Sequence, residues 1–177
     1  LLVVIMFIGA LDAKNKTVKK LLVIRKELSI ISGFPILTHS LIRIMYTLPG
    51  GLQYFINHSD YVQQNDWVKS DLGIGISSFG YVLGILMVAV FIVLWITSFE
   101  SVHKRMGNRK WKKTQRWAYV LYAMLFVHSI TLHLGWMINW GIAMEDNNYI
   151  IKEIIAITTT MVIFSSYLIL RLNKLKR

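Results

Sequence analysis

Two histidines deep in apolar segments are the residues best placed to do chemistry. His39 lies in LSIISGFPILTHSLIRIMYTL, and His128 lies in QRWAYVLYAMLFVHSITLHLGWMINW. Each follows a basic cluster by about 12 residues, which is about 18 Å along a helix. Both imidazoles then lie at one depth if the clusters mark one membrane face. Two imidazoles at one depth suit a bis-histidine haem, although a lone histidine on an apolar helix is more often a hydrogen-bonded core residue. Ionisable residues within membrane spans are rare and mostly functional.

Two more ionisable residues lie near these histidines. Arg43 follows His39 by four positions and shares its helix face. A guanidinium inside a membrane needs a partner, which either a haem propionate or the headgroups reached by snorkelling can supply. His133 follows His128 by five positions, about 140° around a helix and about 7.5 Å along it, so the two do not face one partner squarely. His133 could bond a propionate, bind a quinone or occupy a simple interfacial position, and the last is the plainest interpretation.

Small residues flank both histidines. Gly33 leaves room beside His39, and Pro35 cannot donate a backbone hydrogen bond, so we expect a bend there. Gly135 lies two helical turns after His128, on the same face. A flat macrocycle between helices explains this pattern, and close helix packing alone explains it equally well.

The remaining residues indicate little catalytic chemistry. We expect His58 and His103 at solvated or interfacial positions. The apolar segments show no nucleophile–base pair, phosphate-binding loop or carboxylate pair, and we expect the acids in loops: Asp60, Asp66, Asp71, Glu145 and Asp146. This argues against hydrolysis and against a proton or cation transporter, which normally needs intramembrane carboxylates. The absence of cysteine excludes disulfides, thiolate-bound clusters and c-type haem attachment.

The elements that hold these residues are expected to be membrane helices. The 177 residues suit one domain, 1–177, and 55% of them are hydrophobic, with a mean hydropathy of +0.51. A soluble domain cannot bury that much apolar surface, so the sequence predicts an integral membrane protein in the lipid bilayer. The net charge of +11 lies in short loops between apolar runs, which favours membrane orientation over nucleic-acid binding.

The apolar runs predict an all-α bundle with four complete spans and a truncated first helix. The truncated helix is 1–12, and the complete spans are 28–48, 74–98, 117–140 and 149–170. Residues 52–73 are expected to form a polar loop with an amphipathic interfacial segment. Two glycines spaced as Gly80-Tyr-Val-Leu-Gly84 predict close approach of another helix in the third span. Because the sequence opens within an apolar run, we expect a missing segment before it.

The lysine and arginine residues set the expected orientation. All 20 except Arg43, Lys69 and Lys152 lie in 14–26, 99–116 and 171–177, which fall on one side if every run crosses once. The excess of positive charge predicts that this side, with the C-terminus, is cytoplasmic. The loops 49–73 and 141–148 then face outward.

Both histidine segments resemble the ferric reductase-like transmembrane family. IRKELSIISGFPILTH resembles its Arg-Arg-x-Leu-Gly-Leu…His segment, and TSFESVHKRMGNRKWKKTQRWAYVLYAMLFVH resembles its Thr-Ser…Arg-x-Leu-Gly…Trp…Leu-His…Tyr…His segment. The resemblance covers roughly residues 10–140. Within the family it is strongest to the haem-b membrane subunits of bacterial periplasmic methionine sulfoxide reductase systems. It implies six helices in the full-length protein, a bacterial inner membrane, and His39 and His128 as axial haem ligands.

One departure from the family pattern bears on the number of haems. The family usually has another histidine 13 residues before the ligand that matches His128, and here that residue is Gln115. The resemblance therefore implies one b-type haem, with its iron, rather than two. Family members with soluble flavin and NADPH domains carry them downstream, and no Rossmann fingerprint occurs here. A flavin or nicotinamide partner is then expected to be a separate chain, with a quinone or flavin at its interface.

These observations favour a membrane haem-b subunit that transfers electrons. We expect His39 and His128 as the ligands, Arg43 as a propionate partner and His133 as a further candidate near the cofactor. The donor would be a membrane quinol or a cytosolic flavoprotein docked on 99–116, and the acceptor an outer-face redox protein. The alternative is a haem-free anchor or assembly subunit of a larger complex.

Overall fold

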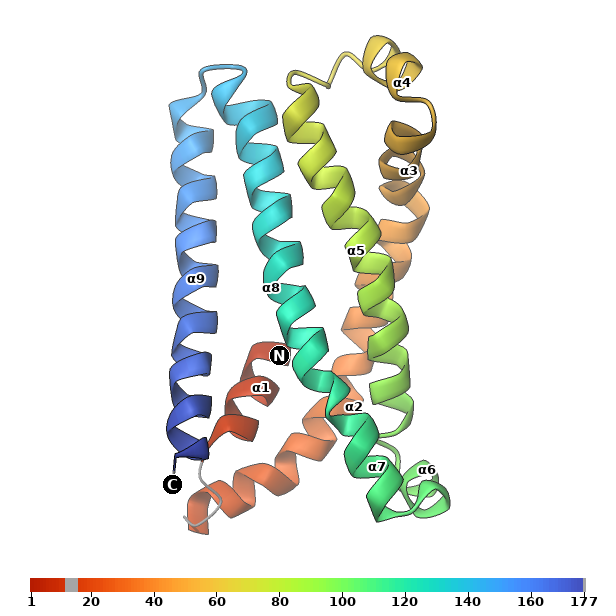
Figure 1. Cartoon of the computed structure of the whole chain (residues 1–177), viewed down its shortest axis with the longest axis vertical. Coiled ribbons are helices and arrows are strands. Elements are labelled where there is room, and N and C mark those ends of the chain that lie inside the picture. Colours follow the sequence, from red (N-terminus) through yellow and green to blue (C-terminus); the bar gives the residue numbers. More distant parts are fainter. Residues whose placement is uncertain (12–15, 177) are drawn as a thin grey trace. The chain divides into compact units, whose positions relative to one another are not determined.

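The computed structural model describes residues 1–11 and 16–176 and contains only helical elements in that part of the chain (Figure 1). This confirms the expected all-α fold. Lys14, in the predicted basic cluster, lies outside the described residues. The elements are α1 Leu2–Ala10, α2 Lys16–Tyr46, α3 Leu48–Ile56, α4 His58–Gln64, α5 Asp71–Ile96, α6 Glu100–Met106, α7 Asn108–Gln115, α8 Trp117–Trp136, the π-helix η1 Met137–Ile142 and α9 Asn147–Leu175.

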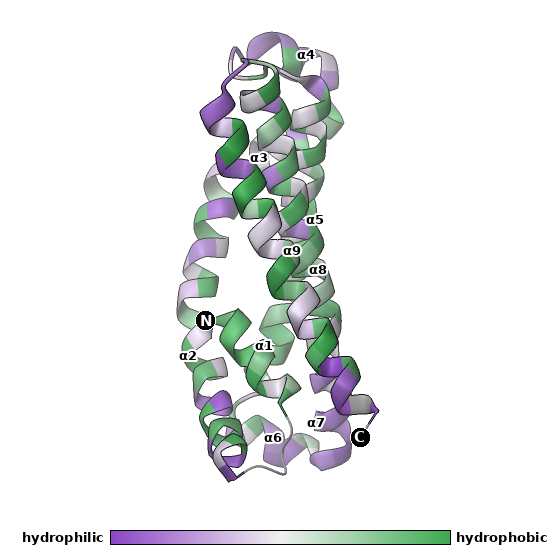
Figure 2. Cartoon of the chain, turned by 90° about the vertical axis from the view of Figure 1, so that its left-hand side faces the viewer, coloured by the Kyte–Doolittle hydropathy of each residue, from purple (hydrophilic) through white to green (hydrophobic). Residues whose placement is uncertain are grey.

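Four helical stretches in the described residues are long and apolar enough to cross a membrane, as expected. They are Lys16–Tyr46, Asp71–Ile96, Asn108–Ile142 and Asn147–Lys174. Figure 2 shows that hydrophobic residues dominate α1 and α5, whereas hydrophilic residues dominate α6 and α7. The expectation of a polar loop over 52–73 was wrong in part, because α3 and α4 make much of this segment helical. The proline at the start of α3 has a preset φ and its missing N–H is not needed there.

The chain divides into two compact units. The first unit contains residues 1–39, 89–122 and 162–177, and the second contains 40–88 and 123–161. In the first unit α1 packs against the end of α9, where the rings of Phe7 and Tyr167 lie 6.1 Å apart. The ammonium of Lys174 donates to the carbonyl oxygens of Gly9 and Leu11, at 3.2 and 2.7 Å. A cation at a helix C-terminus satisfies carbonyls that have no helical partner.

Elsewhere in the first unit, the indole of Trp95 holds the end of α5 against α2. It donates to the carbonyl oxygen of Ile30 at 2.9 Å and its ring packs edge-on against Phe34. The indole occupies the space beside Gly33, where a Cβ would lie 2.0 Å from the indole nitrogen. Of the two explanations left open for the small residues near His39, the structure shows close helix packing at Gly33. The helix continues through Pro35 to Tyr46.

In the second unit, α5 and α8 approach closely along a row of glycines. A Cβ on Gly80 would lie 2.8 Å from the hydroxyl of Thr131, and one on Gly135 would lie 2.6 Å from the carbonyl oxygen of Gly73. A Cβ on Gly84 would lie 3.1 Å from the ring of His128. The close approach predicted from Gly80 and Gly84 is confirmed, and α8 is the helix that packs there.

Asn139 in η1 ties the start of α5 to the end of α8 in the second unit. Its side chain is fully buried and its amide oxygen accepts hydrogen bonds from the backbone N–H groups of Lys69 and Ser70, both at 2.9 Å. Its amide nitrogen donates to the carbonyl oxygen of Trp67 at 3.2 Å. These backbone donors precede α5 and have no partner within that helix, so Asn139 supplies one from another element.

Candidate functional site

His128 is held against α5 by its ring nitrogen. Nδ1 lies 2.8 Å from the carbonyl oxygen of Gly80, and a carbonyl only accepts, so Nδ1 carries the proton. The ring can come this close because Gly84 has no side chain at its edge. The neutral imidazole then has its lone pair on Nε2. Histidines that ligate metals commonly donate their other ring N–H to a backbone carbonyl in this way, so the chemistry of His128 fits an axial ligand.

His39 lies at the end of the first unit, on α2, and its side chain is exposed. Among the described residues it makes no hydrogen bond, unlike His128. An exposed imidazole in an apolar helix has no water to bond within a bilayer, so a bound group or another chain must supply its partner. His39 therefore also suits a ligand role.

Arg43 and Tyr81 interact in the second unit. Arg43 is exposed on α2, and its charge acts on the phenol of Tyr81, which also contacts Trp136. Three indoles follow one another here, with ring centroids 6.1 Å apart for Trp67 and Trp136, and 6.5 Å for Trp136 and Trp140. Arg43 is thus in a polar and aromatic neighbourhood, in which a bound propionate is one possible partner for its guanidinium.

His133 is hydrogen-bonded to Glu153 in the second unit, between α8 and α9. Its Nδ1 lies 2.6 Å from a carboxylate oxygen, and the two side chains are 38% and 5% exposed. The other carboxylate oxygen lies 3.6 Å from the ammonium of Lys152. The five acids expected in loops did not include Glu153, which belongs to α9. Two of the five, Asp60 and Asp71, lie in helices instead, in α4 and at the start of α5. Position 153 falls within the expected last span, 149–170, and this was the signal in the sequence.

Gln115 lies beside a small, mostly apolar cavity in the first unit. Its amide donates to the hydroxyl of Thr97 at 3.0 Å. The cavity has a volume of about 50 Å³, and its lining includes Arg25, Ser29, Ser32, Ser98 and Gln115. Pockets for drug-sized ligands are about 300–1,000 Å³, so this cavity is far smaller than such a pocket.

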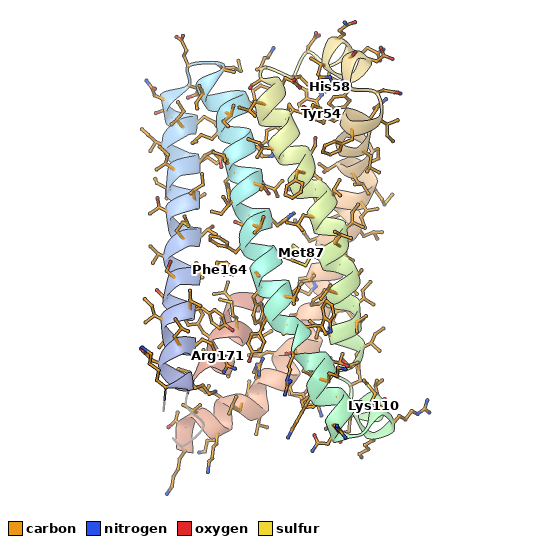
Figure 3. The ribbon with its side chains drawn as sticks, viewed as in Figure 1. Tyr54, His58, Met87, Lys110, Phe164 and Arg171 are labelled. Atoms are coloured by element: carbon orange, nitrogen blue, oxygen red, sulfur yellow. The ribbon has the colours of Figure 1, made fainter. Side chains whose placement is uncertain are left out.

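His58, expected at a solvated or interfacial position, is exposed and also belongs to a cluster in the second unit with Tyr54 and Asp71. Its Nε2 lies 2.8 Å from the Asp71 carboxylate, and the Tyr54 hydroxyl donates to the same oxygen at 2.8 Å. Tyr54 and His58 project from α3 and α4 in Figure 3. Desolvation and the nearby carboxylate raise the pKa of Tyr54 to about 12. This cluster fixes the α3–α4 segment against the start of α5.

The basic segment forms α6 and α7 in the first unit. Lys110 extends away from the helix (Figure 3), and the ring of His103 lies 4.4 Å from that of Trp111. Glu100 bonds Lys26, which holds the pKa of the Glu100 carboxyl below its usual value. The exposed cations of α7 present a basic surface, which suits an acidic partner or anionic lipid.

No three His, Asp or Glu side chains converge to hold a metal ion within residues 1–11 and 16–176. A haem brings its own porphyrin nitrogens as ligands to the iron. A haem site therefore needs only two imidazoles from the protein, and no cluster of three protein ligands.

Comparison with known proteins matches most of the chain to one family. The model of the family described as ferric reductase like transmembrane component matches residues 1–126. An uncharacterized protein of Treponema pallidum (strain Nichols) is 30% identical over 115 residues, which are 65% of this chain and 29% of that protein. The chain therefore matches less than a third of that relative's length. No solved structure matches the chain.

Proposed function

Because the chain belongs to the ferric reductase-like transmembrane family, which indicates a role in membrane electron transfer, we propose that it is a haem-b subunit of a redox system. His39 and His128 are the proposed axial ligands, and Arg43 pairs with a propionate. When bound, the haem supplies one-electron chemistry between ferric and ferrous iron.

The observation that carries the proposal is the hydrogen bond from Nδ1 of His128 to the carbonyl oxygen of Gly80, at 2.8 Å. This bond fixes the tautomer and the orientation of the ring before any cofactor binds. A preset ring loses less conformational entropy on ligation and directs the Nε2 lone pair along one line. His39 contributes an exposed imidazole from a different helix.

The number of cofactors follows from Gln115. A carboxamide is not a haem ligand, and its hydrogen bond to Thr97 beside a cavity of about 50 Å³ supports one haem per chain. One haem accepts one electron at a time. The proposed donor is a quinol in the membrane or a flavoprotein on the α7 surface. The proposed acceptor is an outer-face redox protein.

Absorption spectroscopy of the purified protein tests the proposal. A reduced-minus-oxidised difference spectrum of a b-type haem is expected from cells supplied with haem, and His39→Ala and His128→Ala should each abolish it. His58→Ala is the matched control, because His58 pairs with Asp71 in another part of the second unit. A haem-free wild-type protein would instead favour the anchor or assembly role. If His128→Ala keeps the low-spin haem spectrum, a residue other than His128 is the axial ligand.

A further inference from the structure

The hydrogen-bonded pair of His133 and Glu153 is not used by the proposed haem ligation, and its burial is uneven. The carboxylate is 5% exposed, whereas the imidazole is 38% exposed. The carboxylate of Glu153 is therefore covered by its neighbours, whereas part of the imidazole of His133 lies at the surface of the unit. An ionised carboxylate only accepts hydrogen bonds, so the proton in this contact is on Nδ1. In the tautomer that can accept a further proton, the lone pair is on Nε2.

Helix packing alone is a weak reason for this pair. Ser129 and Thr160 already join α8 to α9 by a hydrogen bond of 3.2 Å without burying any charge. A buried carboxylate loses its hydration, so a contact that includes one stabilises helix packing less than a neutral hydrogen bond does. Ionisable residues within membrane helices more often bind substrates or relay protons.

The surroundings suit a planar aromatic ligand that arrives from the lipid. Trp136 lies one helical turn after His133, and its indole stacks on Trp140 with an interplanar angle of 16°. Tyr149 contacts Glu153 and lies near Tyr81. Ile154, next to the carboxylate in sequence, is 47% exposed and offers apolar surface for a hydrocarbon tail. The ligand must therefore combine an aromatic ring, a hydroxyl group and a lipid-soluble tail.

We propose that His133, oriented by Glu153, binds the headgroup of a lipid-soluble hydroquinone and accepts its hydroxyl proton. The O–H bond breaks, its electron pair remains on oxygen as the quinolate, and the proton forms the Nε2–H bond. Glu153 stabilises the resulting imidazolium. Lys152, near the start of α9, lies 3.6 Å from the other oxygen of the same carboxylate, and the proposed path of the proton leads toward that end of the helix. The inference rests on the proposed function, in which a membrane quinol is one candidate donor.

Quenching of tryptophan fluorescence by decylubiquinone and by a short-chain menaquinone tests the site, in purified protein reconstituted in lipid nanodiscs. Saturable quenching is expected from the wild type. His133→Ala should weaken binding about tenfold, which is the scale of one lost hydrogen bond to a charged or polarised group. Glu153→Gln keeps the shape of the acid but removes its charge, and should weaken binding by a smaller factor. Ser129→Ala removes the other polar contact between α8 and α9 and should bind like the wild type.

Unchanged quenching in both His133→Ala and Glu153→Gln would overturn the proposal, and so would an equal loss in Ser129→Ala. The haem spectrum, recorded on the same samples, separates this proposal from the function on which it rests. A normal haem spectrum with quinone binding lost in His133→Ala supports both. A protein that binds quinone through His133 but carries no haem supports the quinone site and overturns the haem assignment.

Discussion

Gly33 and Trp95 lie in direct contact in the first unit, and the contact leaves no space for a methyl group. A Cβ on Gly33 would lie 2.0 Å from the indole nitrogen of Trp95, which donates to the carbonyl oxygen of Ile30. The indole of Trp95 cannot move away from the backbone at Gly33 without losing its hydrogen bond to Ile30. The absence of a side chain at Gly33 is therefore a requirement of α2–α5 packing.

Substitution of Gly33 by alanine should destabilise the protein by about 2 kcal/mol, because overpacking a close contact costs about 1–3 kcal/mol. Thermal unfolding in detergent measures the loss. Trp95→Phe removes the indole N–H and shortens the ring, so the double variant Gly33→Ala/Trp95→Phe should lose less than the sum of the single variants. If the losses in stability of the two single variants simply add in the double variant, the methyl group at position 33 does not clash with the indole of Trp95.

The ring of His128 depends in the same way on Gly84. A Cβ there would lie 3.1 Å from Cε1, and a valine would push the imidazole away from the Gly80 carbonyl. We expect Gly84→Val to weaken haem retention about tenfold, the scale found when an outer partner of a ligating histidine is removed. The amount of haem that remains per protein after dialysis against apomyoglobin measures this retention. Leu86→Ala, on an exposed part of α5, is the control and should retain haem normally.

Some of this site was predictable from the sequence, and some was not. Hydropathy and the glycine spacing in α5 predict the spans and the close approach of a helix, because both depend on local pattern. The bond between His128 and Gly80 joins residues 48 positions apart, and nothing in either segment specifies which carbonyl the ring will meet. Glu153 lies within a predicted span and could have been recognised there. Its pairing with His133 needs the register of α8 against α9, which periodicity alone does not determine.

Restoring the histidine of the family pattern at Gln115 should not restore a second haem. The cavity beside Gln115 is about 50 Å³, and Arg25 is among the residues that line it. We expect Gln115→His to keep one haem per chain by pyridine haemochrome assay. The variant also loses the amide hydrogen bond to Thr97 and should be slightly less stable. Two haems per chain would contradict the account given for this cavity.

Alkaline pH should weaken the second unit through Tyr54. Its pKa rises from an ordinary value of 10.0 to about 12 in the folded protein, chiefly through desolvation and then through the nearby Asp71. The unfolded chain therefore loses the phenol proton first, so the contribution of Tyr54 is fully present below pH 10 and disappears between pH 10 and 12. Ultraviolet titration of tyrosinate and unfolding as a function of pH measure this. Tyr54→Phe should remove this part of the alkaline loss, and an unchanged pH profile in that variant would exclude Tyr54 as its source.

Asn139 should be the polar residue whose loss costs most in the second unit. Its buried amide oxygen accepts from the backbone N–H groups of Lys69 and Ser70, and alanine would leave both donors without that acceptor. A fully buried donor left unsatisfied costs about 1–3 kcal/mol, and these two donors are only partly buried, so Asn139→Ala should lower the free energy of unfolding by about 2–4 kcal/mol. Asn139→Asp keeps an oxygen acceptor but loses the donation to the Trp67 carbonyl, so it should be intermediate. Denaturant unfolding in mixed micelles gives these free energies. Equal losses in the two variants would show that the amide oxygen is not the important group, because only the aspartate retains it.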